Sequence, residues 1–252
     1  MNKSNIHYQT EEISHYYSTH RTTWDQFYES ERAVITRLKP DPSASVLDIG
    51  CGCGGLGMAL RESFGVMDYS GVEINLTAAE AGRRLNPEAK IYHGDILELG
   101  SRELADKHYL IVVSLSCIDF NVLFTDMLSA AWERVAPGGF LVSTFRLTDG
   151  AGFNDITHSY QYINFEGKLE GERAPYIIHN AETLLRRMLA FDPSEIYSYG
   201  YWGAPSETAV TPCERICFAA FSLQKRKPGN TGPINLTFEL PDEIRSVLNH
   251  TG

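Results

Sequence analysis

The residues of this chain whose types and spacing could do chemistry begin in the stretch DIGCGCGG, which starts at Asp48. Glycines in such a stretch let the backbone adopt positive φ and pass close to a ligand. A short strand pattern at residues 46–49 precedes the glycines, and a helical pattern at residues 56–64 follows them. We therefore weigh three ligands for this turn: a metal ion, a dinucleotide and some other cofactor.

A metal ion would need Cys51 and Cys53 together with further ligands, for which Cys213 and Cys217 are available. The latter two lie in or beside a predicted strand, and the set lacks the paired C-x-x-C spacing that is typical of zinc sites. We therefore expect no metal and interpret the cysteines as small, buried packing residues.

A dinucleotide is the second candidate, because Gly50, Gly52 and Gly55 match G-x-G-x-x-G between a strand and a helix. This motif alone is weakly specific. A short-chain reductase would also carry a Tyr-x-x-x-Lys pair after its fourth strand as a hydroxyl general acid, and the sequence has none there. A nicotinamide oxidoreductase is therefore the least favoured enzyme.

Predicted strands and helices alternate around the turn. The strands cover residues 46–49, 69–74, 90–93, 109–116 and 140–145, and the helices cover residues 56–64, 77–85, 102–107 and 121–135. Parallel strands need crossover connections, so this alternation predicts an α/β fold with a doubly wound, mostly parallel sheet. Ligands of such sheets bind outside the carboxyl ends of the strands, which is where the glycine turn begins.

The third candidate rests on a resemblance. The acid-x-G-x-G-x-G array from Asp48 to Gly54 resembles the first motif of class I S-adenosylmethionine-dependent methyltransferases. Glu73 at the end of the second strand, Asp95 after the third strand and the stretch RVAPGGFLVST after the fourth crossover helix resemble further motifs of that family. All four occur in the family's order within residues 45–144.

The resemblance implies S-adenosyl-L-methionine as the cofactor and S-adenosyl-L-homocysteine as the product. It implies that Asp48 meets the positively charged methionyl amino group, that Glu73 meets the ribose hydroxyls and that Asp95 meets the adenine amino group. The expected cofactor-binding residues are Asp48, Gly50, Cys51, Gly52, Glu73, Ile74, Asp95, Ile96, Ser114, Ser116, Tyr17 and Arg21.

The family's fold implies a Rossmann-like, seven-stranded sheet. We expect an N-terminal helical lid at residues 1–40, the methyltransferase domain at residues 41–225 and a C-terminal tail at residues 226–252. Strand patterns at residues 195–201 and 215–223 would close the sheet as a hairpin. An insert after strand five, residues 146–180, would lie over the acceptor site.

Polar and aromatic side chains after strand four and in the insert suit a small acceptor molecule. The expected acceptor-binding residues are Cys117, Phe120, Arg146, Tyr160, Tyr162 and Tyr176. His158 or His179 is the candidate general base, because histidine titrates near neutral pH. Asp119 stands where some amino methyltransferases carry an Asn/Asp-Pro-Pro-Tyr/Phe motif, but the prolines are absent here.

Composition limits the partners. Lysine and arginine number 22 against 32 acidic residues, and no basic stripe beyond Lys225 to Lys227 is available for a nucleic-acid backbone. An odd count of five cysteines indicates reduced thiols, and no apolar run is long enough for a signal core or a membrane span. We expect a cytoplasmic protein without nucleic-acid or membrane partners, and we leave a homodimer open.

These observations favour methyl transfer to a small molecule, with a hydroxyl of a sugar or secondary metabolite as the expected acceptor group. The alternatives are an RNA or protein methyltransferase, which the acidic charge disfavours, and a non-catalytic S-adenosylmethionine-binding protein.

Overall fold

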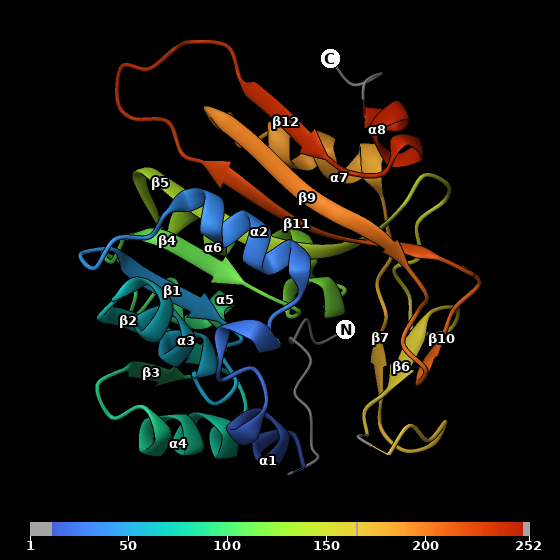
Figure 1. Cartoon of the computed structure of the whole chain (residues 1–252), viewed down its shortest axis with the longest axis horizontal. Helices are drawn as coiled ribbons and strands as arrows, with labels where there is room; N and C mark the ends of the chain where they lie inside the picture. The colour runs from blue at the N-terminus through green and yellow to red at the C-terminus, as the bar shows by residue number, and fades with distance from the viewer. Residues whose placement is uncertain (1–11, 165, 249–252) are drawn as a thin grey trace.

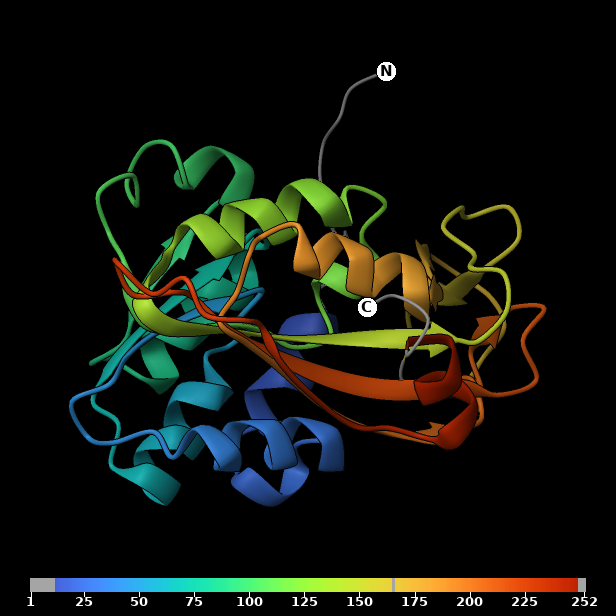
Figure 2. The same cartoon turned by 90° about the horizontal axis from the view of Figure 1, so that it is seen from above.

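The computed structural model describes residues 12–164 and 166–248. A twisted central sheet runs through the molecule, and a smaller sheet lies at one end of it (Figure 1). Helices cover both faces of the central sheet, so the main body has three layers (Figure 2). This arrangement confirms the predicted doubly wound α/β fold.

The first half of the chain forms the parallel part of the sheet. Its strands are β1 (Ser45–Ile49), β2 (Asp68–Glu73), β3 (Lys90–His93), β4 (Tyr109–Ser114) and β5 (Val135–Thr148). The connecting helices are α3 (Gly55–Phe64), α4 (Leu76–Leu85), α5 (Ile96–Leu99), η2 (Ile118–Phe120) and α6 (Phe124–Glu133). All four pairings among these strands are parallel.

The second half of the chain completes the sheet. Its elements are β8 (His179–Asn180), α7 (Ala181–Leu189), β9 (Glu195–Gly203), β11 (Ile216–Gln224), β12 (Asn235–Glu239) and α8 (Asp242–Leu248). The order along the sheet is β12-β9-β11-β5-β4-β1-β2-β3, and the short β8 pairs with β5. The predicted hairpin is confirmed, since β11 is antiparallel to both β5 and β9.

The described residues form nine strands of this sheet in place of the seven predicted. One addition is β8, and the other is β12, which lies in the expected tail and pairs in parallel with β9. The predicted helix at residues 102–107 is wrong, because these residues form turns after α5. The helix begins earlier because the Asp95 side chain accepts a hydrogen bond from the Leu97 amide, 2.9 Å away.

The core explains the continuous apolar character of β4. Val112 is fully buried in the cluster that contains Leu128 of α6, whereas Ile111 and Val113 belong to the cluster of Val34 in α2. Both faces of a parallel sheet are covered by helices, so its central strands are apolar on both sides.

The N-terminal segment contains α1 (Glu12–Thr19), η1 (Trp24–Gln26) and α2 (Glu29–Leu38). α2 packs on β9 and β11, whereas α1 packs beside α4. Residues 1–11 of the expected lid lie outside the described residues.

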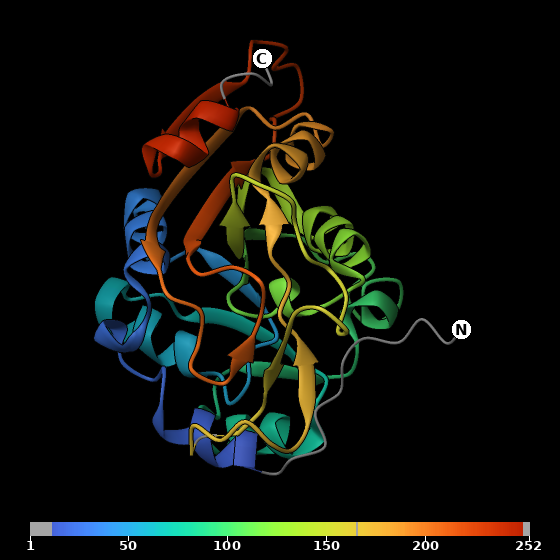
Figure 3. The same cartoon turned by 90° about the vertical axis from the view of Figure 1, so that its right-hand side faces the viewer.

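The predicted insert contains β6 (Tyr160–Tyr162) and β7 (Arg173–Pro175), which join β10 (Ala209–Val210) in the smaller antiparallel sheet. This sheet lies on the right-hand side of Figure 1, and it therefore faces the viewer in Figure 3. Within the described residues, no helix has the length and apolar character that crossing a membrane requires.

The C-terminal elements are part of the core. Ile244 of α8 is fully buried in the large core cluster, whereas Leu236 of β12 is 40% exposed.

We expect Ile244→Ala to lower the free energy of unfolding by about 2–5 kcal/mol, because it leaves a cavity. Leu236→Ala is the matched control and should change it by less than about 0.5 kcal/mol. Urea titrations of both variants measure this, and equal stabilities would show that α8 does not contribute to the core.

Candidate active site

A cavity opens at the carboxyl ends of β1, β2, β3 and β4. Its walls are the turn after β1, the segments after β2, β3 and β4, and part of the N-terminal segment. The lining includes eleven of the expected cofactor-binding residues, namely Tyr17, Arg21, Asp48, Gly50, Cys51, Gly52, Glu73, Ile74, Asp95, Ile96 and Ser116. The twelfth, Ser114, lies fully buried beneath the cavity wall.

The glycine turn is closed in from several sides. Gly50, Gly52 and Gly54 have φ values of 76°, 54° and 74°, a region that side chains rarely adopt. A Cβ atom on Gly50 would lie 2.4 Å from the Cys117 sulfur. The turn therefore needs glycine for conformation and for space.

Glu73 is held in a fixed orientation at the end of β2. Its Oε2 accepts a hydrogen bond from the Gly52 amide and its Oε1 accepts one from the Asn75 amide, both at 2.8 Å. These two backbone donors fix the plane of the Glu73 carboxylate at the cavity wall.

Asp48 is a buried carboxyl group beside the glycine turn. It is 4% exposed, and its Oδ2 accepts a hydrogen bond of 2.7 Å from the Tyr69 hydroxyl. Burial raises the pKa of Asp48 to about 7, although the Tyr69 hydrogen bond and the positive charge of Arg21 act against this shift. A cationic group in the cavity would favour the ionised form.

The N-terminal segment closes directly on the glycine turn. A Cβ atom on Gly55 would lie 2.1 Å from the Arg21 carbonyl oxygen, and one on Gly52 would lie 3.3 Å from the Tyr17 ring. Burial raises the pKa of Tyr17 to about 12, so its hydroxyl is protonated at neutral pH. Contacts with Gly52 and Gly55 thus bring Tyr17 and Arg21 to the cavity.

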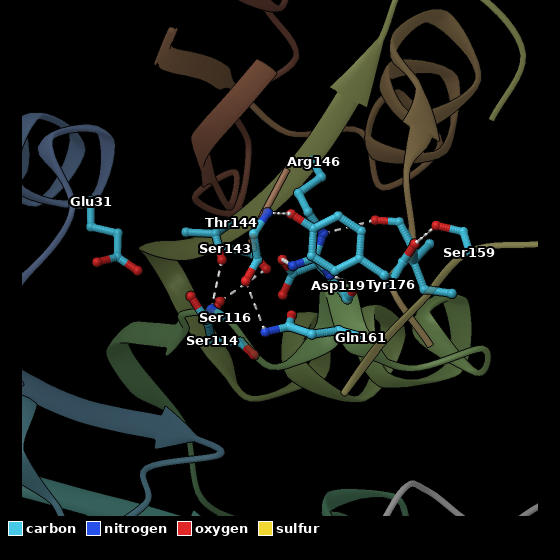
Figure 4. A network of polar contacts seen from close by, with 12 residues as sticks. Glu31, Ser114, Ser116, Asp119, Ser143, Thr144, Arg146, Ser159, Gln161 and Tyr176 are labelled. Atoms are coloured by element: carbon cyan, nitrogen blue, oxygen red, sulfur yellow. Dashed lines mark hydrogen bonds and ion pairs between the residues drawn. The ribbon is translucent and has the colours of Figure 1, made fainter. Parts of the chain in front are cut away.

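A buried polar network lies next to the cavity, between β5 and the insert (Figure 4). Arg146 is 5% exposed and pairs with Asp119, with 3.3 Å between Nη1 and Oδ2. Its Nε donates to the Ile177 carbonyl oxygen, and its Cζ lies 4.0 Å from the Phe120 ring centroid and 4.1 Å from that of Tyr176. Arg146 and Tyr176 do not line the cavity, but Phe120 and Cys117 do.

The remaining expected acceptor residues lie farther away, in β6. Tyr160 and Tyr162 share one face of this strand and contact each other, with ring centroids 5.5 Å apart. Gln161 faces the other way, where its Nε2 donates to Thr208 Oγ1 at 3.1 Å. The structure does not bring the two tyrosines into the cavity lining.

Neither candidate histidine base lines the cavity. His179 is 7% exposed and lies between the rings of Phe124 and Phe145, and burial lowers its pKa to about 3. The His158 side chain is exposed and its Nδ1 lies 2.9 Å from Asp155 Oδ1. A base needs hydrogen-bond reach to the proton that it removes, and the structure places neither ring at the cavity wall.

The sequence interpretation missed several cavity residues. They include Asn75 after β2, Asn121 after η2, Phe27 of the N-terminal segment and Met127 of α6. Glu31 does not line the cavity and was not predicted either; it is fully buried beside Arg21. Among the described residues, no group of three or more His, Cys, Asp or Glu side chains could hold a metal ion.

Comparisons with known proteins agree with this geometry. Residues 46–139 match a family model described as a methyltransferase domain. Over 75 residues the chain is 35% identical to the dTDP-3-amino-3,6-dideoxy-alpha-D-glucopyranose N,N-dimethyltransferase of Streptomyces fradiae, an alignment that covers 29% of each chain. The chain therefore matches less than a third of the length of this curated relative.

Two solved structures share the fold. Phosphoethanolamine N-methyltransferase 2 of Haemonchus contortus superposes with a TM-score of 0.57 at 13% identity, over 85% of this chain and 56% of that one. A candidate S-adenosylmethionine dependent methyltransferase of Listeria monocytogenes gives 0.52 at 16% identity, over 78% of this chain and 98% of that one. The domain match, the motifs and the fold together support a class I S-adenosylmethionine-dependent methyltransferase.

The contact between Gly55 and the Arg21 carbonyl can be tested directly. Gly55→Ala is compatible with the helical backbone of α3, but its methyl group has to displace the segment around Arg21. We expect faster amide hydrogen exchange at residues 16–27 and at least about tenfold weaker binding of S-adenosylhomocysteine, because Tyr17 and Arg21 leave the wall. Gly150→Ala, where a Cβ meets nothing closer than 3.7 Å, is the control. Unchanged exchange in Gly55→Ala would contradict the packing described.

Proposed function

We propose that this methyltransferase binds S-adenosylmethionine in the cavity described and transfers its methyl group to a hydroxyl or amino group of a small polar molecule. The observation that carries the proposal is the convergence of Asp48, Glu73 and the glycine turn on one cavity at the strand ends. The acidic net charge of −10 and the sugar amine named for the curated relative support a small acceptor.

The residues present fit the cofactor's groups. Asp48 would hold the methionyl amino group by charge, and Glu73 would accept hydrogen bonds from the ribose hydroxyls. Asp95 would lie beside the adenine amino group. The glycine turn lets the backbone approach the cofactor where a Cβ would meet Cys117 or Tyr17. The cofactor, when bound, supplies a methyl carbon that its sulfonium activates.

The chain's own contribution to the reaction is binding, orientation and exclusion of water. The segment around Tyr17 and Arg21 closes one side of the cavity, and Phe120 and Cys117 form the wall toward the insert. Alignment of the acceptor with the methyl carbon converts a bimolecular step into an intramolecular one, which is a large share of the rate enhancement in such transfers.

Two substitutions test the cofactor site. We expect Asp48→Ala and Glu73→Ala each to weaken S-adenosylhomocysteine binding at least about tenfold, because each removes a charge-assisted hydrogen bond of about 1.5–3 kcal/mol. Asp68→Ala, at the exposed start of β2, is the matched control. Isothermal titration calorimetry measures the affinities, and circular dichroism checks the fold. Wild-type affinity in both folded variants would refute the site.

The pKa of Asp48 predicts a pH dependence. Burial raises the pKa of the Asp48 carboxyl to about 7 in the unliganded protein. Below that pH the carboxyl is protonated and loses its attraction for the ligand's amino group. We expect affinity for S-adenosylhomocysteine to fall as pH decreases below 7, approaching about tenfold per unit below pH 6. Asp48→Asn should bind weakly with a flat profile between pH 5 and pH 8. An identical profile in wild type and variant would count against this role.

Acceptor identity is a separate measurement. Wild-type protein is incubated with labelled S-adenosylmethionine and a panel of sugar derivatives and other small hydroxyl or amino compounds, and methylated products are detected by mass spectrometry. Labelling of RNA or protein with none of the small molecules would overturn the small-acceptor proposal.

A further inference from the structure

The Arg21 guanidinium is held on one side by a residue that does not line the cavity. Glu31 is fully buried, and its Oε1 accepts a hydrogen bond of 2.9 Å from Arg21 Nη2. Arg21 Cζ also lies 4.5 Å from the centroid of the Phe27 ring, which is itself part of the cavity wall. Glu31 and Phe27 thus fix the position of the guanidinium, and Arg21 itself is a lining residue of the cavity.

Arg21 stands on the side of the cavity where Asp48 lies. Its positive charge acts on the Asp48 carboxyl and on the Tyr17 hydroxyl. Its hydrogen bond to Glu31 uses Nη2, and the described part of the chain provides no hydrogen-bond partner to its Nε or Nη1. Arginine presents five N–H donors in a rigid fork that matches a carboxylate, so these nitrogens are available to one.

Capping of α2 does not account for Glu31. The residue is at the third position of the helix, and its Oε2 accepts a hydrogen bond of 2.8 Å from the Tyr28 amide, as in a capping box. Capping uses that single oxygen and is equally served by glutamine. The second oxygen and the negative charge are committed to Arg21, although burial raises the pKa of the Glu31 carboxyl and Arg21 has to offset that cost.

We propose that Glu31 is a positioning residue that holds Arg21 for the carboxylate of the cofactor's methionyl end. This inference rests on the proposed function, because it takes S-adenosylmethionine as the ligand of the cavity. Glu31 acts through Arg21 and does not touch the cofactor. Without the negative charge, the partly buried guanidinium turns toward solvent, since the Arg21 side chain is already 18% exposed.

The test compares two ligands that differ only in the carboxylate: S-adenosylhomocysteine and decarboxylated S-adenosylhomocysteine. The measured quantity is the ratio of their dissociation constants, determined by calorimetry. For the wild type we expect the carboxylate to improve affinity about 10–100-fold, as a charge-assisted pair does. Arg21→Ala should bring the ratio close to one.

Glu31→Gln keeps the cap and removes the charge. We expect it to lower the ratio at least about fivefold while affinity for the decarboxylated ligand stays near that of the wild type. Glu29→Gln is the matched control: Glu29 is in the same first turn of α2 but is exposed and bonds Tyr199, and its ratio should not change. In the double variant Arg21→Ala/Glu31→Gln, the second change should have no further effect on the ratio.

The outcomes separate the inference from the proposed function. A folded Glu31→Gln variant with an unchanged or increased ratio would overturn the positioning role, because Glu31 would then be only a cap or a competitor for Arg21. A wild-type ratio near one would overturn it while leaving the cofactor assignment intact. Wild-type protein that binds neither ligand would refute the proposed function itself and with it this role.

Discussion

Close packing around the glycine turn is the constraint on which the rest of the site depends. The turn meets Cys117 of the β4 loop at Gly50 and the backbone of the N-terminal segment at Gly55. Cys51 of the same turn packs against Gly71 of β2, where a Cβ would lie 2.5 Å from the sulfur. Its two cysteines are buried packing residues, as the sequence indicated. Separate parts of the chain can therefore share one cavity wall because one residue at each of these contacts is a glycine.

The sequence was sufficient for the features that depend on local pattern. The apolar run of β4 reports burial on both faces, and Asp48, Glu73 and Asp95 each follow or end a predicted strand, where a parallel sheet gathers its ligand-binding residues. β12 gave no such signal: its residues are mostly exposed or half-buried, and the strand exists because β9 offers it an edge.

Contacts between residues that are distant in the sequence were not predicted either, because they too leave no local pattern. Glu31 and its partner Arg21 are ten positions apart across a turn, so only the folded chain reveals the pair. The insert poses a similar problem, because aromatic and histidine residues there can face the cavity, the core or solvent. His179 lies between the apolar rings of Phe124 and Phe145, and Arg146 binds the backbone of the insert. Neither orientation is encoded in residue type.

The N-terminal segment contacts both the glycine turn and the main body of the molecule. Its α2 is part of the main body, packed on β9 and β11, whereas α1 reaches the cavity edge beside α4. Arg21 lies between the two helices and is held by Glu31 from the body side. The Arg21–Glu31 ion pair thus joins a residue of the cavity wall to the helix that packs on the sheet.

We expect the cavity at the ends of β1, β2, β3 and β4 to hold S-adenosylmethionine in one orientation. A crystal structure of the complex with S-adenosylhomocysteine shows that orientation. It should place the ribose at Glu73, the amino group at Asp48 and the adenine beside Asp95. A ligand bound in the reverse direction, or at a site outside this cavity, would show that the assignment is wrong.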